Sequence, residues 1–548
     1  MSHYVLGIDF GSLSARALLI DTRSGRIVGE AESVYEHAVM DKTLCDGSSL
    51  PADYALQHPA DYLAAMGDVV KGVLATSGLQ NTDIGAVCLD FTGSTVMPTT
   101  EDGTPLCFLD KYKNNRHAYV KMWKHHAAAA YADRLVKIAE VRNEPFLALY
   151  SGKVSGEWLI PKLWQILDED AALYDNIYTF IEAGDWMVWM LTGKRVRNAC
   201  AAGYKALWQG ADEGYPSKDF FKALDKRLEN VVEEKLKGDV LPLGTIAGNV
   251  DERGAKLSGL AVGTPVCVSL LDAHAAFPAS GITEPGKLLM IMGTSSVQLA
   301  LGKEMRPKAG ICGIVKDGIF PGYFAYETGQ TCVGDHFDWF VKNYFPASYA
   351  EAAKKEGMNA HEYLTMLASR KKPGESGVLA LDWWNGCRTD LMDETVSGLF
   401  IGMTLATKPE DLYRALIEAT AFGTRKVIDV YESAGVPVDE VYACGGLASK
   451  NAMLMQIYAD VTGKPIRVLN TKQAGAVGCA ILAAVAGKMH ATLADAAEVM
   501  AVKADKVYTP IKENEESYAK LYKEYLTLHD LFAENGMMKR LRTLAEIE

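Results

Sequence analysis

The chain has 548 residues, and its 56 basic and 69 acidic side chains give a formal net charge of −13 at pH 7. This length predicts about two to four domains, and the acidic balance argues against non-specific binding to nucleic acid or to an anionic membrane. The ten cysteines are scattered singly, without CxxC pairs or paired Cys/His spacing, which favours a reducing cytoplasm and argues against structural zinc.

The first elements along the chain form a run of hairpins. An apolar strand over residues 4–10 carries Asp9 near its end, and strands over residues 15–21 and 26–30 follow it. The tip between the first two strands, DFGSLSAR, offers backbone N–H groups and small hydroxyls to an anion. An ordinary hairpin turn is the alternative. No basic segment leads into a long apolar core here, so we expect no secretory signal.

The segment that follows mixes helices with one further strand. Hydrophobic periodicity predicts helices over residues 60–75, 118–141, 155–167 and 183–192, the last of them closed by Gly193. A strand is expected over residues 84–90, with the sequence DFTGST at its end. Residues 238–260 are expected to be loop-like.

An acidic residue, Asp272, occupies the most informative position of the first half. It follows an apolar, strand-like run over residues 264–271 and is flanked by small residues in the sequence LDAHAA. A carboxylate at the end of a buried strand, with room beside it, can act on a bound substrate. The alternative is that Asp272 only caps a helix, because aspartate is a favoured N-cap residue.

The opening pattern returns in the second half of the chain. A change of structural unit is expected near residues 279–285. Beyond it, a strand over residues 286–292, the turn GTSS and a strand over residues 297–301 repeat the earlier order of strand, glycine-hydroxyl turn and strand. We interpret this as a repeated architecture rather than a short-period solenoid.

The remaining elements complete a mixed α/β pattern. Strands are expected over residues 378–381, 440–444 and 465–470, after a polar helical region that ends at about residue 370. A long helix begins with a capping box at Thr407–Glu410, and Ser449 caps a helix over residues 451–461. Two further helices follow, one over residues 474–487 and a final one with an aromatic stripe. The helix over residues 474–487 is rich in small residues and too short to span a bilayer, so we expect it in the core.

Three glycine-rich turns suggest a nucleotide-binding site. The chain has no GxxxxGK[ST] sequence and no GxGxxG after a strand, which excludes a P-loop and weakens a dinucleotide interpretation. The two glycine-hydroxyl tips, if they face each other, could hold the β- and γ-phosphates from both sides. The glycine pair before the helix over residues 451–461 would allow a nucleoside to approach the backbone.

The order of DFGSLSAR, DFTGST, LDAH, GTSS, ETGQ and CGGLASKN resembles that of the FGGY carbohydrate kinases, in the actin/Hsp70-like ATPase superfamily, over nearly the whole chain. The resemblance implies an α/β fold of two ribonuclease H-like ATPase domains with an interdomain cleft. Residues 1–280 would bind the sugar and supply the catalytic base, and residues 281–548 would bind the nucleotide.

The sequences WK at residue 123, SGEW, YKALW, ETGQ and LDWWNG are similar to the branch of this family that acts on L-ribulose. The resemblance therefore implies ATP- and Mg²⁺-dependent phosphorylation of L-ribulose, or a related 2-ketopentose, at the C5 hydroxyl, as in L-arabinose catabolism. Two alternatives stay open. One is another kinase of the family, acting on xylulose or glycerol, and the other is an ATP-driven binding module without kinase activity.

The resemblance also assigns roles to single residues. Asp272 matches the catalytic base, and Asp9 matches a carboxylate near Mg²⁺. The matched nucleotide-binding positions are Gly11, Ser12, Gly293, Thr294, Gly445, Gly446 and Asn451. The matched sugar-binding positions are Gly93, Lys205, Asp272 and Glu327.

Two positions depart from the family pattern. His125 and His126 stand where many members carry a carboxylate that holds substrate hydroxyls, and Cys387 stands where an arginine is common. The sugar contact near His125 is therefore open, and Cys387 receives no role. The expected partners are the sugar and ATP, without nucleic acid or membrane, and a homodimer is one option for the assembly state.

Overall fold

The first of two large sheets is built from the beginning of the chain. The computed structural model describes residues 3–545, so the outermost ends of the predicted units 1–280 and 281–548 lie outside it. The strand order of this sheet is β11-β12-β5-β1-β2-β3, with β13 also paired to β5. Its strands are β1 (Tyr4–Phe10), β2 (Ser14–Asp21), β3 (Ile27–Val34), β5 (Ile84–Phe91), β11 (Ile246–Asn249), β12 (Pro265–Cys267) and β13 (Leu270–Leu271).

The second large sheet repeats the centre of the first. Its order is β16-β17-β15-β14-β20-β21-β22. The strands are β14 (Gly286–Met292), β15 (Ser296–Gly302), β16 (Gly313–Lys316), β17 (Phe324–Gln330), β20 (Val438–Cys444), β21 (Ile466–Leu469) and β22 (Ala504–Tyr508). In each sheet an antiparallel hairpin, β1–β2 or β14–β15, has a parallel strand, β5 or β20, beside its first member. The predicted duplication is therefore confirmed.

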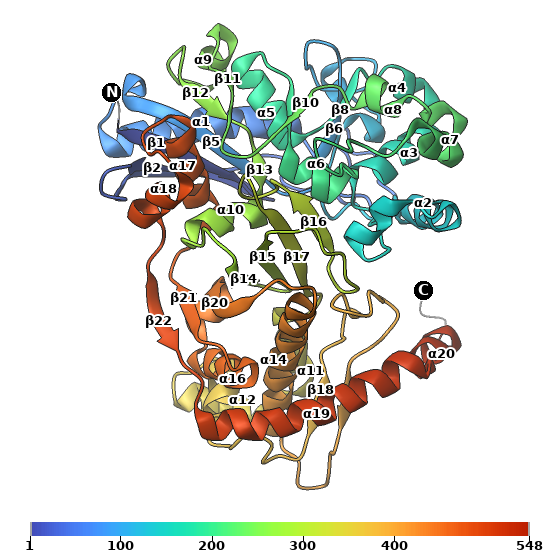
Figure 1. Cartoon of the computed structure of the whole chain (residues 1–548), viewed down its shortest axis with the longest axis vertical. Coiled ribbons are helices and arrows are strands. Elements are labelled where there is room, and N and C mark those ends of the chain that lie inside the picture. Colours follow the sequence, from blue (N-terminus) through green and yellow to red (C-terminus); the bar gives the residue numbers. More distant parts are fainter. Residues whose placement is uncertain (1–2, 546–548) are drawn as a thin grey trace.

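Smaller sheets and the helices surround these two sheets (Figure 1). The short strands are β4 (Leu56–Gln57), β6 (Val96–Thr99), β7 (Val120–Lys121), β8 (Thr179–Glu182), β9 (Val196–Asn198), β10 (Asp239–Leu241), β18 (Leu379–Leu381) and β19 (Leu399–Ile401). The helices before the second sheet are α1 (Pro59–Ser77), α2 (Ala129–Arg142), α3 (Leu159–Glu169), α4 (Ala171–Asp175), α5 (Ala183–Thr192), α6 (Ala199–Ala206), α7 (Lys218–Leu224), α8 (Val231–Lys235), α9 (Glu252–Ser258) and α10 (Asp272–Ala279).

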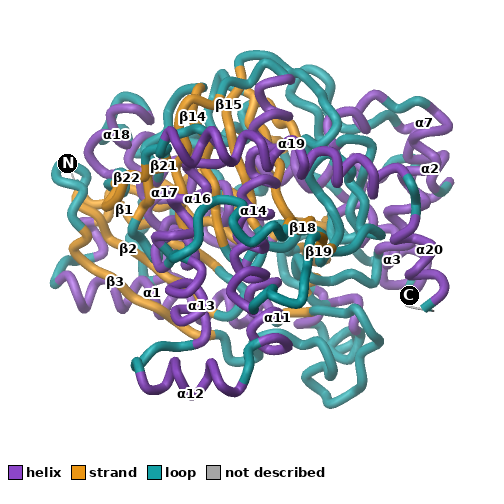
Figure 2. Tube along the Cα trace, turned by 90° about the horizontal axis from the view of Figure 1, so that it is seen from below, coloured by secondary structure: helices purple, strands orange, loops and turns teal. Residues whose placement is uncertain are grey.

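The later helices pack mainly on the second sheet. They are α11 (Gly334–Tyr344), α12 (Ala347–Lys355), α13 (Ala360–Ala368), α14 (Pro409–Ser433), α15 (Gly446–Lys450), α16 (Ala452–Thr462), α17 (Ala474–Ala486), α18 (Leu493–Met500), α19 (Lys512–Glu534) and α20 (Met537–Leu544). The long helix α19 lies across α14 and α16 (Figure 2), and its predicted aromatic stripe packs there through buried Tyr518, Tyr522 and Tyr525.

Two of these helices are exceptions: α18 packs on α17 and α10, and α17 itself returns to the first sheet. It packs on β1 and β5 and crosses α10, and Figure 1 shows it beside β1 and β2. Small residues make this crossing very close: a Cβ atom on Gly478 would lie 1.7 Å from the carbonyl oxygen of Ala275. The prediction of a tightly packed core helix is confirmed, and the last part of the chain completes the core of the first sheet.

One predicted helix is wrong in its first part and confirmed in its second. Residues 118–141 were expected to be continuous helix, but β7 and a turn occupy residues 120–128, and α2 begins only at Ala129. The reason is tertiary: β7 pairs with β4 and β6, and Val120 and Met122 are fully buried by that pairing. Local helix propensity is a weak preference that such packing overrides.

Other boundaries shifted for local reasons. The helix expected from residue 155 begins at Leu159, and the segment 238–260 contains β10, β11 and α9 rather than a loop. Asn451, not Ser449, caps α16, because the short helix α15 intervenes. The cap of α14 is one residue later than predicted: the Asp411 carboxylate accepts the backbone N–H of Lys408.

Among the described residues, no helix combines the length and apolar character needed to cross a membrane.

The α10–α17 crossing generates a stability prediction. Alanine in place of a mid-helix glycine usually stabilises by up to about 1 kcal/mol, but at Gly478 the new methyl group would collide with the Ala275 carbonyl. Overpacking of this kind costs about 1–3 kcal/mol. We therefore expect Gly478→Ala to lower the melting temperature in thermal unfolding followed by circular dichroism.

The matched control is Gly446→Ala, where an added Cβ meets no heavy atom within 4 Å. It should leave the melting temperature unchanged. Equal melting temperatures for Gly478→Ala and the unaltered protein would contradict the close crossing.

Candidate active site

Three carboxylates meet at one edge of the first sheet. Asp9 and Asp90 are register partners on the adjacent parallel strands β1 and β5. Leu271 of β13 is the register partner of Phe91, so Asp272 follows at the same edge. Since partners on neighbouring strands point to the same face, the sheet itself brings these acids together.

Asp272 is the first residue of α10. The N-cap is Leu271, so the alternative that Asp272 serves as a helix N-cap is wrong. Its Oδ1 accepts the N–H of Ala273 at 2.7 Å. Burial and the charge of Asp9 raise the pKa of Asp272 to about 6, although the Ala273 and Gly93 N–H groups and Lys205 oppose the rise. A carboxylate with this pKa is ionised at neutral pH and is a stronger base than an ordinary aspartate.

Asp90 was not among the predicted site residues. It is fully buried, and burial together with the charges of Asp9 and Asp272 raises its pKa well above the usual value. Its Oδ2 accepts the Cys479 thiol at 3.2 Å, whereas its Oδ1 has no donor among the described residues. The repeated dipeptide Asp-Phe at the ends of both strands is the sequence signal that could have revealed it.

The N-terminus of α17 lies against this carboxylate pair. A Cβ atom on Gly475 would lie 2.8 Å from Asp90 Oδ2 and 3.2 Å from Asp9 Cγ. The first backbone N–H groups of a helix have no partner within the helix and favour negative charge. Two carboxylates with an unpartnered oxygen are also the ligands that Mg²⁺ prefers, so Asp9 and Asp90 fit a divalent cation.

A second charged cluster surrounds Glu327, a buried residue of β17. Lys205 Nζ lies 3.8 Å from its Oε1, Arg388 Nη2 lies 3.3 Å from the same oxygen, and His274 Nε2 lies 3.2 Å from Oε2. Burial opposes ionisation, but the charges of Lys205 and Arg388 and the adjacent His274 imidazole hold the pKa of Glu327 far below normal. His274 and Arg388 were not predicted, because neither reaches Glu327 except through the fold.

Gly93 lies between the two clusters. A Cβ atom at this position would lie 3.4 Å from Leu271 and 3.6 Å from Cε of Lys205. Glycine therefore leaves room beside Lys205 and Asp272. The structure brings together the four residues predicted to line a sugar, which are Gly93, Lys205, Asp272 and Glu327.

The first predicted phosphate tip is held by three contacts. The N–H of Gly11 donates to the Ser14 carbonyl at 3.0 Å. The Ser12 hydroxyl accepts the indole N–H of Trp123 at 3.0 Å, and the Ser12 carbonyl accepts the Gln57 amide at 2.8 Å. The tip is thus fixed by two side chains from outside the hairpin.

The second tip and the glycine pair lie beside each other. The carbonyls of Gly293 and Thr294 accept N–H groups from the start of α11, at 3.0 and 2.8 Å. A Cβ atom on Gly445 would lie 2.2 Å from the carbonyl of Met292, at the end of β14, whereas one on Gly446 meets nothing within 4 Å. Gly446 therefore offers exposed backbone next to the GTSS turn.

Asn451 has a structural task. Its side-chain oxygen accepts the N–H of Leu454 at 3.0 Å and caps α16, and its amide nitrogen donates to Thr365 at 3.3 Å. Both ends of the amide are occupied inside the protein, so a nucleoside contact of Asn451 stays a prediction.

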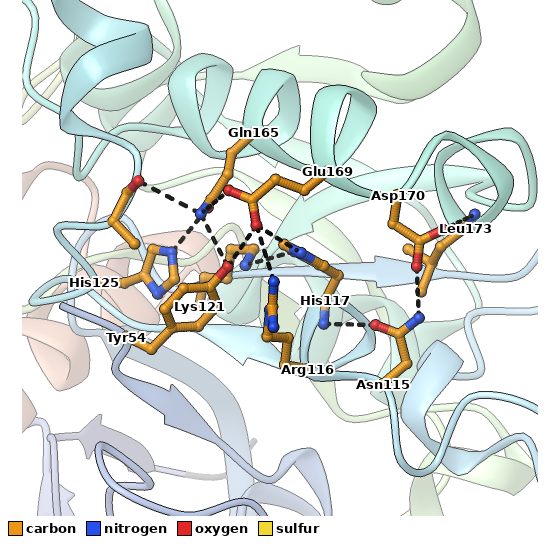
Figure 3. Close-up of polar contacts among 11 residues, drawn as sticks. Tyr54, Asn115, Arg116, His117, Lys121, His125, Gln165, Glu169, Asp170 and Leu173 are labelled. Atoms are coloured by element: carbon orange, nitrogen blue, oxygen red, sulfur yellow. Dashed lines mark hydrogen bonds and ion pairs between the residues drawn. The ribbon is translucent and has the colours of Figure 1, made fainter. Parts of the chain in front are cut away.

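The two positions that depart from the family pattern, His125 and Cys387, have different surroundings in the structure. His125 is fully buried in a polar network (Figure 3), where its Nε2–H donates to Gln165 at 3.0 Å and its Nδ1 accepts the N–H of Ala55. Burial lowers its pKa, and both ring nitrogens already have partners inside the protein, so the imidazole has no free group for a sugar hydroxyl. Cys387 is buried with its pKa raised to about 12. The adjacent Arg388, not Cys387, reaches the site.

The chain is similar to proteins of one family over nearly its whole length. The models for the N-terminal and C-terminal domains of the FGGY family of carbohydrate kinases match residues 4–277 and 288–487. A ribulokinase from Anoxybacillus flavithermus is 50% identical over 546 residues, which cover 98% of this chain and 96% of the relative. A ribulokinase from Mycolicibacterium smegmatis is 43% identical, with coverage of 99% and 96%.

The solved structures agree on the fold. The xylulose kinase from Rhodospirillum rubrum has a TM-score of 0.79 at 24% identity, covering 96% of this chain and 99% of that one. Plasmodium falciparum glycerol kinase with ADP has a TM-score of 0.75 at 16% identity, with coverage of 96% and 97%. The predicted α/β fold of the actin/Hsp70-like type and the family resemblance are both confirmed.

The Glu327 cluster generates a linkage prediction. Breaking a buried ion pair by removing one partner costs about 3–5 kcal/mol, so Glu327→Gln should lower the free energy of unfolding at pH 7. Because the folded-state pKa of Glu327 is depressed, its stabilisation is complete above the unfolded pKa of about 4.3. It is lost as the pH falls below that value, so the difference between the two proteins should shrink in acid.

Urea unfolding at pH 7 and near pH 4 measures both effects. The control is Glu432→Gln, which breaks a partly exposed pair with Lys464 and should cost no more than about 1 kcal/mol. If Glu327→Gln lowered the free energy of unfolding more near pH 4 than at pH 7, the assignment of an ionised Glu327 would be contradicted.

Proposed function

Because the chain belongs to the FGGY family of carbohydrate kinases, we propose that it phosphorylates L-ribulose with ATP, giving L-ribulose 5-phosphate and ADP, in L-arabinose catabolism. The observation that carries this proposal is the position of Asp272. It lies beside a charged cluster suited to sugar hydroxyls and at the edge that also holds Asp9 and Asp90. Ribulokinases of other bacteria at up to 50% identity support the choice of sugar.

The proposed base is Asp272. A sugar alcohol is a weak nucleophile, so a positioned carboxylate orients the hydroxyl and accepts its proton as the bond to phosphorus forms. Help of this kind contributes about 10²–10⁴ in rate. The new bond joins the sugar oxygen to the γ-phosphorus, the bond between that phosphorus and the bridging oxygen of ADP breaks, and Asp272 holds the proton.

The sugar-binding role of the Glu327 cluster follows from its donors and acceptors. Glu327 is ionised and accepts hydrogen bonds, whereas Lys205 and Arg388 donate them. Their mutual contacts fix all three side chains before a substrate arrives. A polyol that meets both kinds of group can exchange hydrogen bonds with them, and an aldose or ketose of another shape would leave some buried groups unpaired.

The phosphates are assigned to the two glycine-hydroxyl tips. Phosphoryl transfer depends mainly on alignment and on neutralising charge. Ser12 on one side and Thr294 on the other supply hydroxyls for this purpose, and Gly11 and Gly293 leave space for the phosphates beside each tip because they carry no side chain. Asp9 and Asp90 would hold Mg²⁺, which neutralises phosphate charge when bound.

The remaining assignments complete the proposal. Gly445, Gly446 and Asn451 are proposed to line the nucleoside, with residues 1–280 as the sugar-binding unit and residues 281–548 as the nucleotide-binding unit. A cytoplasmic location is proposed because all ten cysteines are free thiols, as is usual in a reducing compartment.

A substrate panel tests the activity directly. ADP release coupled to NADH oxidation should show the highest kcat/KM with L-ribulose, compared with xylulose, glycerol and other polyols, and ³¹P NMR should place the phosphate on C5. A higher kcat/KM for xylulose or glycerol would assign the chain to another branch of the family. Absence of turnover with every sugar would reject the kinase activity.

The pKa of Asp272 predicts a pH profile. Since the base must be ionised, kcat/KM should reach a plateau above about pH 7 and fall as the pH drops through about 6. Asp272→Asn should lose roughly 10²–10⁴ in kcat while isothermal titration still detects the binding of a non-hydrolysable ATP analogue. An ATP-driven binding module would be insensitive to this substitution.

A further inference from the structure

One buried cation in the first half has no place in the mechanism described so far. Lys162, in α3, is fully buried. Its ammonium donates to the backbone carbonyls of Ser94, Met122 and Lys121, at 2.6, 2.9 and 3.4 Å. An ammonium has three N–H donors, so the three carbonyls satisfy it completely.

The first acceptor belongs to the loop that lines Asp272. Ser94 has φ +58°, a left-handed backbone conformation that a non-glycine residue adopts only when its surroundings hold it. It follows Gly93, whose backbone N–H faces the Asp272 carboxylate and where an added Cβ would lie 3.6 Å from Cε of Lys205. Lys162 therefore fixes the carbonyl next to the sugar-side residues.

The other acceptors belong to the segment that holds the first phosphate tip. Met122 precedes Trp123, and the indole of Trp123 donates to the Ser12 hydroxyl at 3.0 Å. One ammonium thus joins the backbone of the sugar-side loop to the backbone that carries the contact with the phosphate tip. The two segments also pair directly as strands, Val96 of β6 with Lys121 of β7, and Lys162 extends this connection to the carbonyl of Ser94.

The network of Figure 3 holds this segment against α3. Gln165, one turn after Lys162, accepts from His125, and its amide donates to Glu169 at 2.9 Å. Lys121 extends its own ammonium to His117 at 3.3 Å. Burial lowers the pKa of Lys162 to about 7, and Glu157 and Glu182 oppose this shift. The three carbonyl acceptors around Nζ favour the protonated amine.

We propose that Lys162 is a positioning residue that sets the distance between the sugar-side loop and the first phosphate tip. It touches no reacting atom. It couples sugar binding to nucleotide binding, because a shift of either segment would break hydrogen bonds to a buried charge. This inference rests on the proposed kinase activity, in which both segments must be aligned for in-line transfer.

The test compares two buried lysines. In Lys162→Met the three carbonyls lose their donor. In the control, Lys235→Met, another buried ammonium is removed from the carbonyls of Tyr174 and Ile177, which lie away from the site. Both variants should lower the melting temperature, since each leaves buried acceptors unpaired.

Only Lys162→Met should change the chemistry. A misplacement of about 1 Å costs about 10² in rate, so we expect a loss of that size in kcat with L-ribulose, and Lys235→Met should keep the kcat of the unaltered protein. The second readout is the affinity for a non-hydrolysable ATP analogue, titrated with and without L-ribulose. The unaltered protein and Lys235→Met should gain affinity when sugar is present, and Lys162→Met should not.

A third variant tests the same coupling without a substitution in the core. Trp123 is 41% exposed, so Trp123→Phe removes the contact with Ser12 without opening the core, and it should also abolish the sugar-dependent gain in affinity. The inference is overturned if Lys162→Met matches Lys235→Met in kcat, if Trp123→Phe keeps the gain, or if the unaltered protein shows no gain. Absence of sugar turnover in the unaltered protein would instead reject the proposed function.

Discussion

The register of β1 against β5 is the constraint on which the site depends. It forces Asp9 and Asp90 to share one face of the sheet, and β13 adds Asp272 at the same edge. Like charges this close raise the free energy of the folded chain unless something compensates them. The N-terminus of α17, approaching closely because position 475 is glycine, supplies part of that compensation, and a bound cation would supply the rest.

The opposite side of the site is organised by charge balance. Glu327 is the single acceptor among Lys205, His274 and Arg388, which come from the loops and helices of both halves of the chain. Such a cluster is stable only when every member is present, because a buried charge without a partner is costly. The sugar-side residues are therefore held in place before any ligand binds, and the halves of the molecule are linked through them.

Much of the fold could be predicted from the sequence, because its central strands are local patterns. The strands at 4–10 and 286–292 appear with the predicted bounds, since apolar runs closed by glycine turns define them without tertiary information. The first part of the helix predicted over 118–141 failed for the converse reason: β7 forms by pairing with β4, which lies far away in sequence. His274 and Arg388 escaped prediction because their contacts with Glu327 follow from helices and loops that are distant in sequence, and no local pattern marks them. Asp90 was missed although the repeated Asp-Phe dipeptide marks it, because its role depends on the register of β1 against β5.

The return of α17 to the first sheet has a consequence for biogenesis. Residues 474–486 cover β1 and β5 and cross α10, so the apolar surface of the earliest strands stays uncovered until nearly the whole polypeptide has left the ribosome. At translation rates of 5–20 residues per second, this interval after the emergence of β13 lasts roughly 10–40 s. During that time the nascent chain exposes an apolar sheet face, and we expect chaperones that shield such surfaces to bind it.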